Sequence, residues 1–513
     1  MSSLQRGHAA IQSQNPAEAA EWFLKAVNEN PKDPQALACY GQSLCWLGRR
    51  SEGIAYLRQS GSLLLKKARK SRDVAQALMM VEQLQYWNDY AGALDIARQA
   101  VQINGAEVRG FQLLALTYSR LNQNKQALAT GRQALRLAPD SAVLNILQAT
   151  LESGEKMHEA ARRRLEKVLQ QRLSPEETFR AHKELARVLD TLGDYGPVFA
   201  HLHASAEVSG LLPEVQKQDA ALVPRMIKAN TAGFDRELLG RWAGTEFPQD
   251  QPAPVFLIGF MRSGTTLTQE VLGTHPGVFV ADETDSIVAL SHELDKMAPG
   301  RFGPDRLRDL DLQGVLRLRQ SYWDKARARH GDQIGGRLLV DKTTMNTIDL
   351  GLINCVFPDA KVIFVMRDPR DVCLSCFMQI MIPTPSTVHL LTWRGTAEFY
   401  AQVMAWWMHV KQRLTLDFIE FRYEDAVADF EGTFRGVFEL LALPWNPAVA
   451  EFHKRVAGRY IASPSFSQVA QPLYSSSVAR WRHYAAEFAA VEDLLAPFIG
   501  AFRYGDEPPD STA

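Results

Sequence analysis

The chain has 513 residues, more than one hydrophobic core usually serves, so several domains or a domain plus a repeat array are expected. Its formal net charge of −1 provides no overall basic field, which argues against nucleic acid as a partner. The start of the chain is polar, and no run of about 18 apolar residues occurs, so neither a secretory leader nor a membrane span is expected. These properties favour a cytoplasmic protein whose anion site is built locally.

The cysteines support the same compartment. Five are present, an odd number, in apolar segments that lack a second pair at zinc spacing. We therefore interpret them as reduced thiols and expect no metal site. Cys373 and Cys376 have the spacing of a redox pair, but their apolar flanks favour packing.

Residues 1–210 are predicted to be nearly all helical, because apolar residues recur at helical spacing between Pro, Asn and Asp. The segment is self-similar at a period of about 34 residues. Ala93 and Ala100 align with Ala127 and Ala134, and Pro139 ends the later helix. The pattern resembles a tetratricopeptide array of about five degenerate repeats, a solenoid that presents a groove to peptides or proteins. An ordinary helical bundle with chance spacing is the alternative.

Residues 211–251 are predicted to form a helical bridge that ends in the linker-like FPQDQPAP. Residues 252–505 contain the bounded apolar runs PVFLIGF, GRLLVDK and KVIFVMRDP with helical stretches between them. This alternation predicts an α/β domain with a parallel sheet, and residues 506–513 form a tail. Ligands of such sheets bind beyond the carboxyl ends of the strands, where we expect the chemistry.

The segment GFMRSGTTL has the outline of a phosphate-binding loop. Gly259 and Gly264 have the spacing of G-x-x-x-x-G-K-[ST], but Thr265 stands at the lysine position. N–H groups at the start of the following helix would face an anion, and Arg262 could grip the oxygens of a group being transferred. A P-loop kinase or nucleoside triphosphatase is left open, although its lysine is missing, and a structural strand-to-helix turn also needs glycine.

A second anion site is predicted in VMRDPRDVCLS. Arg367 would leave a strand, and Ser375, eight residues later, would lie in the following helix and face the same anion. The alternative is that Arg367 forms a surface ion pair with Asp368 or Asp371, which contributes little. Two anion sites together imply a nucleotide with phosphates at both ends.

Three motifs together resemble those of sulfotransferases that use 3′-phosphoadenosine 5′-phosphosulfate: R-S-G-T-T-L after one strand, R-D-P-R-x-x-x-x-S after another, and FRYEDAV further on. The resemblance covers about residues 250–505. It implies a P-loop-like sulfotransferase domain and a set of cofactor-contacting residues, namely Arg262, Ser263, Gly264, Thr265, Thr266, Leu267, Arg367, Ser375, Tyr423, Ser465 and Arg480.

Within this superfamily the chain resembles the tyrosylprotein sulfotransferases. THPGVFVADET is similar to H-P-x-V-x-x-x-E-E-T, which places Glu283 at the acid that serves there as base. LLVDKTTMN resembles the N-K-D-P segment, with Lys342 at its lysine but without the Asp and Pro. SFSQVAQPLYSSSVARW resembles S-x-x-Q-V-x-x-P followed by S-K-W, so Arg480 replaces a lysine and Ser465 matches the first serine. Gln379 stands where the family has a basic residue.

The resemblance implies metal-independent transfer of a sulfuryl group to a hydroxyl acceptor, with peptide tyrosine expected by analogy and carbohydrate or metabolite hydroxyls left open. Arg262 and Lys342 would stabilise the sulfuryl and bridging oxygens. Ser465 would donate to the leaving group, and Glu283 would act as base.

Simpler structural roles remain as alternatives for three of these residues. Glu283 could cap the following helix, Lys342 could be a surface lysine, and Tyr423 could belong to the core. A helical scaffold with an inactive transferase domain is the non-enzymatic alternative for the whole chain. Neither nucleic acid nor a membrane is expected as a partner.

Overall fold

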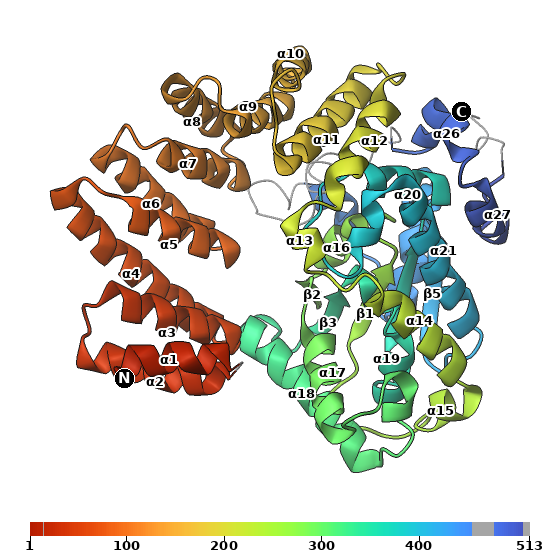
Figure 1. Cartoon of the computed structure of the whole chain (residues 1–513). Helices are drawn as coiled ribbons and strands as arrows, with labels where there is room; N and C mark the ends of the chain where they lie inside the picture. Colours follow the sequence, from red (N-terminus) through yellow and green to blue (C-terminus); the bar gives the residue numbers. More distant parts are fainter. Residues whose placement is uncertain (14, 454–476, 506–513) are drawn as a thin grey trace. The chain divides into compact units, whose positions relative to one another are not determined.

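The computed structural model describes residues 1–13, 15–453 and 477–505. The chain separates into two compact units, Met1–Asp194 and Tyr195–Ala513 (Figure 1). The repeat helices followed by a parallel-sheet domain confirm the predicted fold class. The domain boundaries given above stay a prediction.

The first unit is made of helices in which each packs against the next along the chain. Small residues allow this packing, since Ala93, Ala100, Ala127 and Ala134 are completely buried. Gly7 has the same function, because a Cβ there would lie 2.4 Å from the Phe23 ring. The helices are α1 (Ser3–Gln12), α2 (Pro16–Glu29), α3 (Pro34–Trp46), α4 (Arg50–Ser71), α5 (Ala75–Tyr86), α6 (Tyr90–Ile103), α7 (Val108–Arg120), α8 (Asn124–Leu137), α9 (Ala142–Gly154), α10 (His158–Val168) and α11 (Pro175–Leu192).

The second unit is built on a parallel sheet of five strands in the order β2-β3-β1-β4-β5. The strands are β1 (Val255–Gly259), β2 (Val278–Asp282), β3 (Leu338–Lys342), β4 (Lys361–Met366) and β5 (Asp417–Arg422). β1 is central and buried along its whole length. Leu257 of β1 pairs with Lys342 of β3 and with Ile363 of β4, and Lys342 also pairs with Asp282 of β2. The carboxyl ends of these four strands, which carry or precede predicted site residues, therefore lie at the same edge of the sheet.

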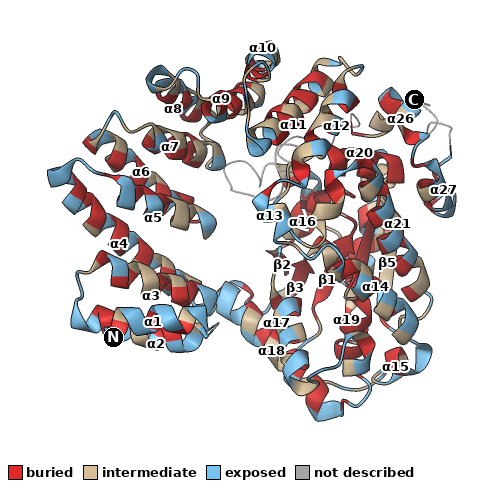
Figure 2. Ribbon diagram, in the orientation of Figure 1, coloured by how far each residue is buried: buried red, intermediate tan, exposed pale blue. Residues whose placement is uncertain are grey.

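Helices surround this sheet, and the residues between the helices and the strands are buried (Figure 2). The longer ones are α12 (Val198–Ser209), α14 (Leu222–Gly233), α16 (Thr265–Gly273), α17 (Ser286–Met297), α18 (Leu312–His330), α19 (Leu350–Val356), α20 (Pro369–Met378), α21 (Trp393–Val410), α23 (Phe430–Leu440) and α27 (Glu492–Ala501). Short helical segments are α13 (Pro213–Gln216), α15 (Arg236–Gly240), α22 (Tyr423–Ala428), α26 (Ala485–Phe488), η1 (Gly303–Arg306), η2 (Gly331–Gln333), η3 (Thr344–Thr347), η4 (Thr387–Leu391), η5 (Pro447–Glu451) and η6 (Arg480–Tyr484).

Aromatic side chains fill the layer between the sheet and α21. Trp407 stacks on Phe364 of β4 with ring centroids 3.8 Å apart. Trp406 is also buried, and its indole N–H donates to the carbonyl of Thr347 at 2.9 Å. Cys373 and Cys376 are fully buried on α20, and all five cysteines are free thiols. Within the described ranges, none of the helices is both long enough and apolar enough to cross a bilayer.

Candidate functional site

The turn between β1 and α16 is built to leave hydrogen-bond donors unused. Arg262 and Gly264 both have positive φ, 69° and 110°. Gly264 is the N-cap residue of α16 and has no side chain that could accept a hydrogen bond from the first N–H groups of the helix. The first N–H groups of a helix lack partners within the helix. Ser263 is only 1% exposed, yet its Oγ has no hydrogen-bond partner among the described residues. A buried unpaired hydroxyl is costly, which indicates that a polar ligand completes this turn.

Glycine is required twice in this turn because its neighbours approach closely. A Cβ at Gly259 would lie 2.5 Å from the carbonyl oxygen of Val365, and one at Gly264 would lie 2.7 Å from the Tyr423 ring. Thr347 braces the turn from η3, since its hydroxyl donates to the Gly259 carbonyl at 2.7 Å. The Thr265 hydroxyl is 3.1 Å from that of Thr344, so the turn is also attached to the segment that follows β3.

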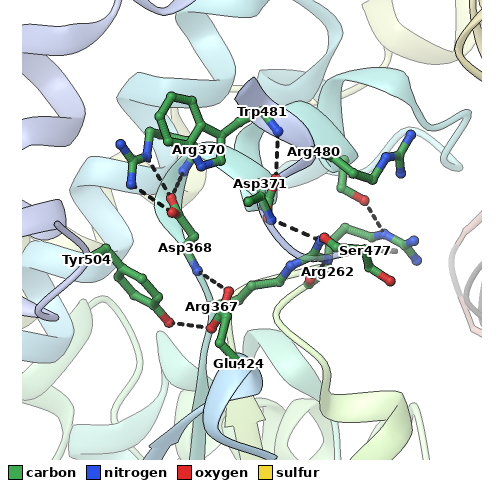
Figure 3. Close-up of polar contacts among 12 residues, drawn as sticks. Arg262, Arg367, Asp368, Arg370, Asp371, Glu424, Ser477, Arg480, Trp481 and Tyr504 are labelled. Atoms are coloured by element: carbon green, nitrogen blue, oxygen red, sulfur yellow. Dashed lines mark hydrogen bonds and ion pairs between the residues drawn. The ribbon is translucent and has the colours of Figure 1, made fainter. Parts of the chain in front are cut away.

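The second predicted anion site lies beside this turn. The Arg262 Nε donates to the Ser375 hydroxyl at 3.0 Å. The Arg367 guanidinium donates to the backbone carbonyls of Arg262, at 3.2 Å, and of Ser477 (Figure 3). Arg367 is 8% exposed and its Nε lacks a partner among the described residues. It also lies 5.1 Å from the centre of the Tyr423 ring. Arg262, Arg367, Ser375 and Tyr423 are thus brought together.

Arg367 does pair with Asp371, one of the two partners considered from the sequence, but the pair is buried and not at the surface. Its nearest carboxylate is that of buried Asp371, at 3.8 Å. The Asp371 carboxylate accepts the backbone N–H groups of Ala479 and Trp481 at 2.7 and 2.9 Å. Burial raises its pKa above the ordinary value, although the charge of Arg367 opposes this shift. Asp371 therefore attaches the segment 477–481 to α20.

The remaining groups in Figure 3 fix the end of β4. The backbone N–H of Asp368 donates to Glu424 at 3.0 Å, and the Tyr504 hydroxyl donates to the same carboxylate at 2.7 Å. Arg370 forms two hydrogen bonds with Asp368 through its side chain and lies 3.6 Å from the centre of the Trp481 ring. Arg480 begins η6, and its guanidinium lies 4.0 Å from the Met378 sulfur, next to Gln379.

Lys342 and Glu283 meet at the ends of β3 and β2. The Lys342 ammonium donates to Glu283 at 2.7 Å and to Asp282 at 3.0 Å. Lys342 is 2% exposed, whereas the Glu283 side chain is 53% exposed. Burial lowers the pKa of Lys342, but the charges of Glu283 and Asp282 outweigh burial and raise the pKa above its ordinary value. Lys342 is therefore a buried cation with two carboxylate partners, which corrects the surface alternative.

Glu283 is held in place by the backbone rather than by a helix. Its φ is 46°, a conformation that side chains other than glycine rarely adopt, and its N–H donates to the Lys342 carbonyl at 2.8 Å. α17 begins only at Ser286 and is preceded by Asp285, so the alternative in which Glu283 caps this helix is wrong. The strained position leaves a half-exposed carboxylate beside a buried ammonium.

A buried carboxylate behind this pair was not selected from the sequence. Asp341 accepts hydrogen bonds from the hydroxyls of Thr284 and Tyr322, both at 2.8 Å, and of Thr343 at 3.0 Å. The Thr284 N–H also donates to the Thr343 hydroxyl at 3.0 Å. Burial raises the pKa of Asp341, and the hydroxyl donors oppose that shift. The sequence does contain one sign of this network, which is an acidic residue inside the apolar run LLVDK.

Two further predicted residues have buried side chains, and a third lies in a part of the chain that the structure does not describe. The Leu267 side chain belongs to the hydrophobic core, so a ligand contact there would come from its backbone. The Thr266 side chain is buried at the start of α16. Ser465 lies outside the described residues.

The chain matches two protein-family models. Residues 254–447 match the model of the sulfotransferase family, and residues 2–33 and 108–141 match that of the tetratricopeptide repeat. A solved sulfotransferase domain from the curacin biosynthetic pathway is 18% identical, with a TM-score of 0.30, and covers 46% of this chain and 98% of that domain.

Three other proteins match longer or shorter parts of this chain at 23–25% identity. Protein-tyrosine sulfotransferase A of Caenorhabditis elegans is 23% identical over 49% of this chain and 67% of its own length. Protein-tyrosine sulfotransferase 1 of Danio rerio is 25% identical over 47% of this chain and 69% of its own. An uncharacterised protein of Aquifex aeolicus is 25% identical over 79% of this chain, which spans about half (52%) of that relative. The chain therefore carries a sulfotransferase-family domain in its C-terminal half, homologous to protein-tyrosine sulfotransferases, after N-terminal tetratricopeptide repeats.

Proposed function

We propose that the domain transfers the sulfuryl group of 3′-phosphoadenosine 5′-phosphosulfate to a hydroxyl acceptor, with Glu283 as the base. The buried donors fit this nucleotide, because Ser263 Oγ and Arg367 Nε lie at two places on one sheet edge and both lack partners among the described residues. Ser263 and the N–H groups of the β1–α16 turn would bind the 5′ end. Arg367 and Ser375 would bind the 3′-phosphate, and Tyr423 would contact the adenosine.

One observation carries the assignment of the base. Glu283 is half exposed and yet fixed at 2.7 Å from the buried Lys342 ammonium. Its carboxylate would accept the proton of the acceptor hydroxyl while the acceptor oxygen bonds to sulfur. The bond from sulfur to the phosphate oxygen then breaks, and its electron pair stays on that oxygen. A positioned base contributes about 10²–10⁴-fold to the rate.

Cations of the chain would stabilise the charge that develops during transfer. Arg262 is placed by Ser375 at the turn, and Lys342 lies two residues before Thr344, which contacts Thr265 of that turn. We propose that Arg262 faces the sulfuryl oxygens and Lys342 the bridging oxygen. Fixed cations in a site of low polarity act without reorganising, so they stabilise the transition state strongly.

The acceptor is proposed to be a tyrosine in a peptide or protein. Two relatives are named protein-tyrosine sulfotransferases, and the repeats of the first unit are of a kind that binds peptides and proteins. The repeats would then recruit the acceptor chain, and the second unit would modify it.

The direct test measures labelled sulfate transfer from the nucleotide by the full chain, offered tyrosine peptides, carbohydrates and small phenols separately. Calorimetry with the product 3′,5′-bisphosphate, with and without a chelator, accompanies it. We expect transfer to tyrosine peptides and chelator-independent binding. Transfer to carbohydrate alone contradicts the acceptor assignment. Bisphosphate binding without any transfer supports the inactive scaffold, and binding of only a nucleoside triphosphate with magnesium contradicts the whole proposal.

A further inference from the structure

A cavity of about 380 Å³ lies in the second unit, between α14, α17, η1 and the start of α19. None of the residues proposed for sulfuryl transfer lines it. Its inner wall is apolar, formed in part by the buried side chains of Phe234, Ile287 and Leu307. Its outer wall includes Val288 and Phe302, which are about half exposed, at 52% and 50%. The volume is within the range of about 300–1,000 Å³ that is usual for small-molecule sites.

Asp349, at the start of α19, contributes a carboxylate to the wall of this cavity. Across the part of the chain that the structure describes, its side chain takes part in no hydrogen bond or ion pair, and it does not cap α19. Burial raises its pKa to about 6, an effect that the more distant charge of Arg306 partly opposes. Asp349 is only partly exposed, and a carboxylate that is largely withdrawn from water without a donor from the protein favours a ligand that supplies one.

The other charged groups of the cavity do not meet this need. Arg306 also lines it, but its guanidinium donates to Asp295 at 2.6 Å, to the Ser291 hydroxyl at 3.2 Å and to the Gly303 carbonyl at 3.2 Å. Asp295 and Arg306 therefore neutralise each other, and His292 is the remaining titratable group on the wall. With this histidine neutral, the cavity retains the single negative charge of Asp349.

We propose that this cavity binds a small organic cation, in which an ammonium or guanidinium group donates to Asp349 and an aromatic or branched apolar body packs against Phe234, Ile287 and Leu307. The site is separate from the one proposed for sulfuryl transfer and goes beyond that function. Charge selects the ligand, because an anion of the same shape would meet Asp349 unpaired. Size selects it too, since the cavity does not admit a folded chain.

The experiment uses 2-phenylethylamine as the probe, titrated into the full chain at pH 8 and followed by calorimetry and by ligand-observed NMR. 3-Phenylpropionate is the matched probe of opposite charge. We expect saturable binding of the amine and at least tenfold weaker binding of the acid. Equal binding of the two probes, or absence of saturable amine binding at millimolar concentration, would overturn the proposal.

Asp349→Asn keeps the size of the side chain and removes its charge. We expect at least a tenfold loss of amine affinity in this variant. Glu293→Gln is the matched control, since Glu293 lies on α17 outside the cavity wall and pairs with Lys296 and Arg317. It should bind the amine as the unmodified chain does. Equal amine affinity of Asp349→Asn and the unmodified chain would contradict the assignment of Asp349.

Thermal unfolding separates loss of the site from loss of the fold. A carboxyl whose pKa is raised on folding destabilises the protein above that pKa. Asp349→Asn should therefore be at least as stable as the unmodified chain at pH 8. Amine affinity unchanged in a folded Asp349→Asn protein overturns the proposal, whereas bisphosphate binding, measured on the same samples, reports the sulfotransferase site independently.

Discussion

Lys342 and Arg367 are two buried cations at the same edge of the sheet, and their partners differ. Lys342 is bonded to two carboxylates, at 2.7 and 3.0 Å. Arg367 donates to two backbone carbonyls and has its nearest carboxylate at 3.8 Å. Both side chains are almost closed to solvent, at 2% and 8% exposure. The difference therefore lies in how much of each charge is already neutralised within the protein.

The two cations therefore divide the roles of one site. Carbonyls orient a guanidinium without cancelling its charge, and the single carboxylate near Arg367 is 3.8 Å away, so Arg367 keeps more of its attraction for a phosphate than Lys342 does. The charge of Lys342 is cancelled by Asp282 and Glu283, so a ligand anion gains less from it before transfer begins. We infer that Arg367 contributes mainly to nucleotide affinity and that Lys342 contributes mainly to turnover. Substitutions at these residues and their neighbours test this division.

Lys342→Met should lower the rate of sulfate transfer by about 10²–10³-fold, because one stabilising cation is lost and two carboxylates are left facing each other. Single-turnover transfer measures the effect at saturating nucleotide. Lys325→Met is the control, since Lys325 forms a comparable ion pair with Asp285 at 2.8 Å. Retention of more than a tenth of the rate in Lys342→Met would contradict the role assigned to this lysine.

Arg367→Gln should weaken binding of the 3′,5′-bisphosphate about 10- to 100-fold, the loss expected for hydrogen bonds to a charged group. The transfer rate at saturating nucleotide should change less than about threefold if the division holds. Calorimetry gives the affinity and single-turnover assays give the rate. Arg422→Gln serves as control, because it removes an arginine at the end of the neighbouring strand β5 that pairs with Asp425 of α22. A loss confined to the rate would reverse the two roles.

Thr284→Val should lower the transfer rate about tenfold and leave bisphosphate affinity unchanged. The substitution removes the hydroxyl that donates to Asp341 and so loosens the backbone that positions Glu283. Thr284→Ser restores the hydroxyl and should restore the rate. If valine and serine variants lose activity equally, packing of the threonine methyl matters and the positioning role is wrong.

Asp341→Asn should change how stability depends on pH. A carboxyl whose pKa is raised on folding stabilises the protein below its unfolded pKa, and this stabilisation is lost as pH rises through the folded pKa. The asparagine variant does not titrate at this position. Its melting temperature minus that of the unmodified chain should therefore increase between pH 4 and pH 8. Thermal unfolding of both proteins across this pH range measures the effect. A constant difference in melting temperature would show that the pKa of Asp341 does not change on folding.

The strands that could be predicted from the sequence are those in which nearly every residue is buried. The runs that became β1, β3 and β4 are almost continuously buried, so their apolar composition is visible. β2 and β5 lie at the sheet edges with mixed exposure, and neither was selected as a strand. In the repeat unit the small residues at Ala93 and Ala127 revealed the period because close helix packing requires them.

The candidate site was predictable where a motif is local and not where packing decides. Gly259, Arg262 and Gly264 lie within one turn, so their spacing carried the signal. The contact of Lys342 with Glu283 joins residues 59 positions apart, and only the family resemblance connected them. The bond from Tyr322 to Asp341 depends on how α18 packs on the sheet, which local sequence does not specify.

Glu283 and Asp282 provide the most direct test, because both carboxylates bind the same ammonium and only one is proposed as the base. Single-turnover sulfate transfer should fall about 10²–10⁴-fold in Glu283→Gln and less than about tenfold in Asp282→Asn. Bisphosphate affinity, measured on the same samples, should stay within about threefold in both variants. Equal rates for Glu283→Gln and Asp282→Asn would contradict the account.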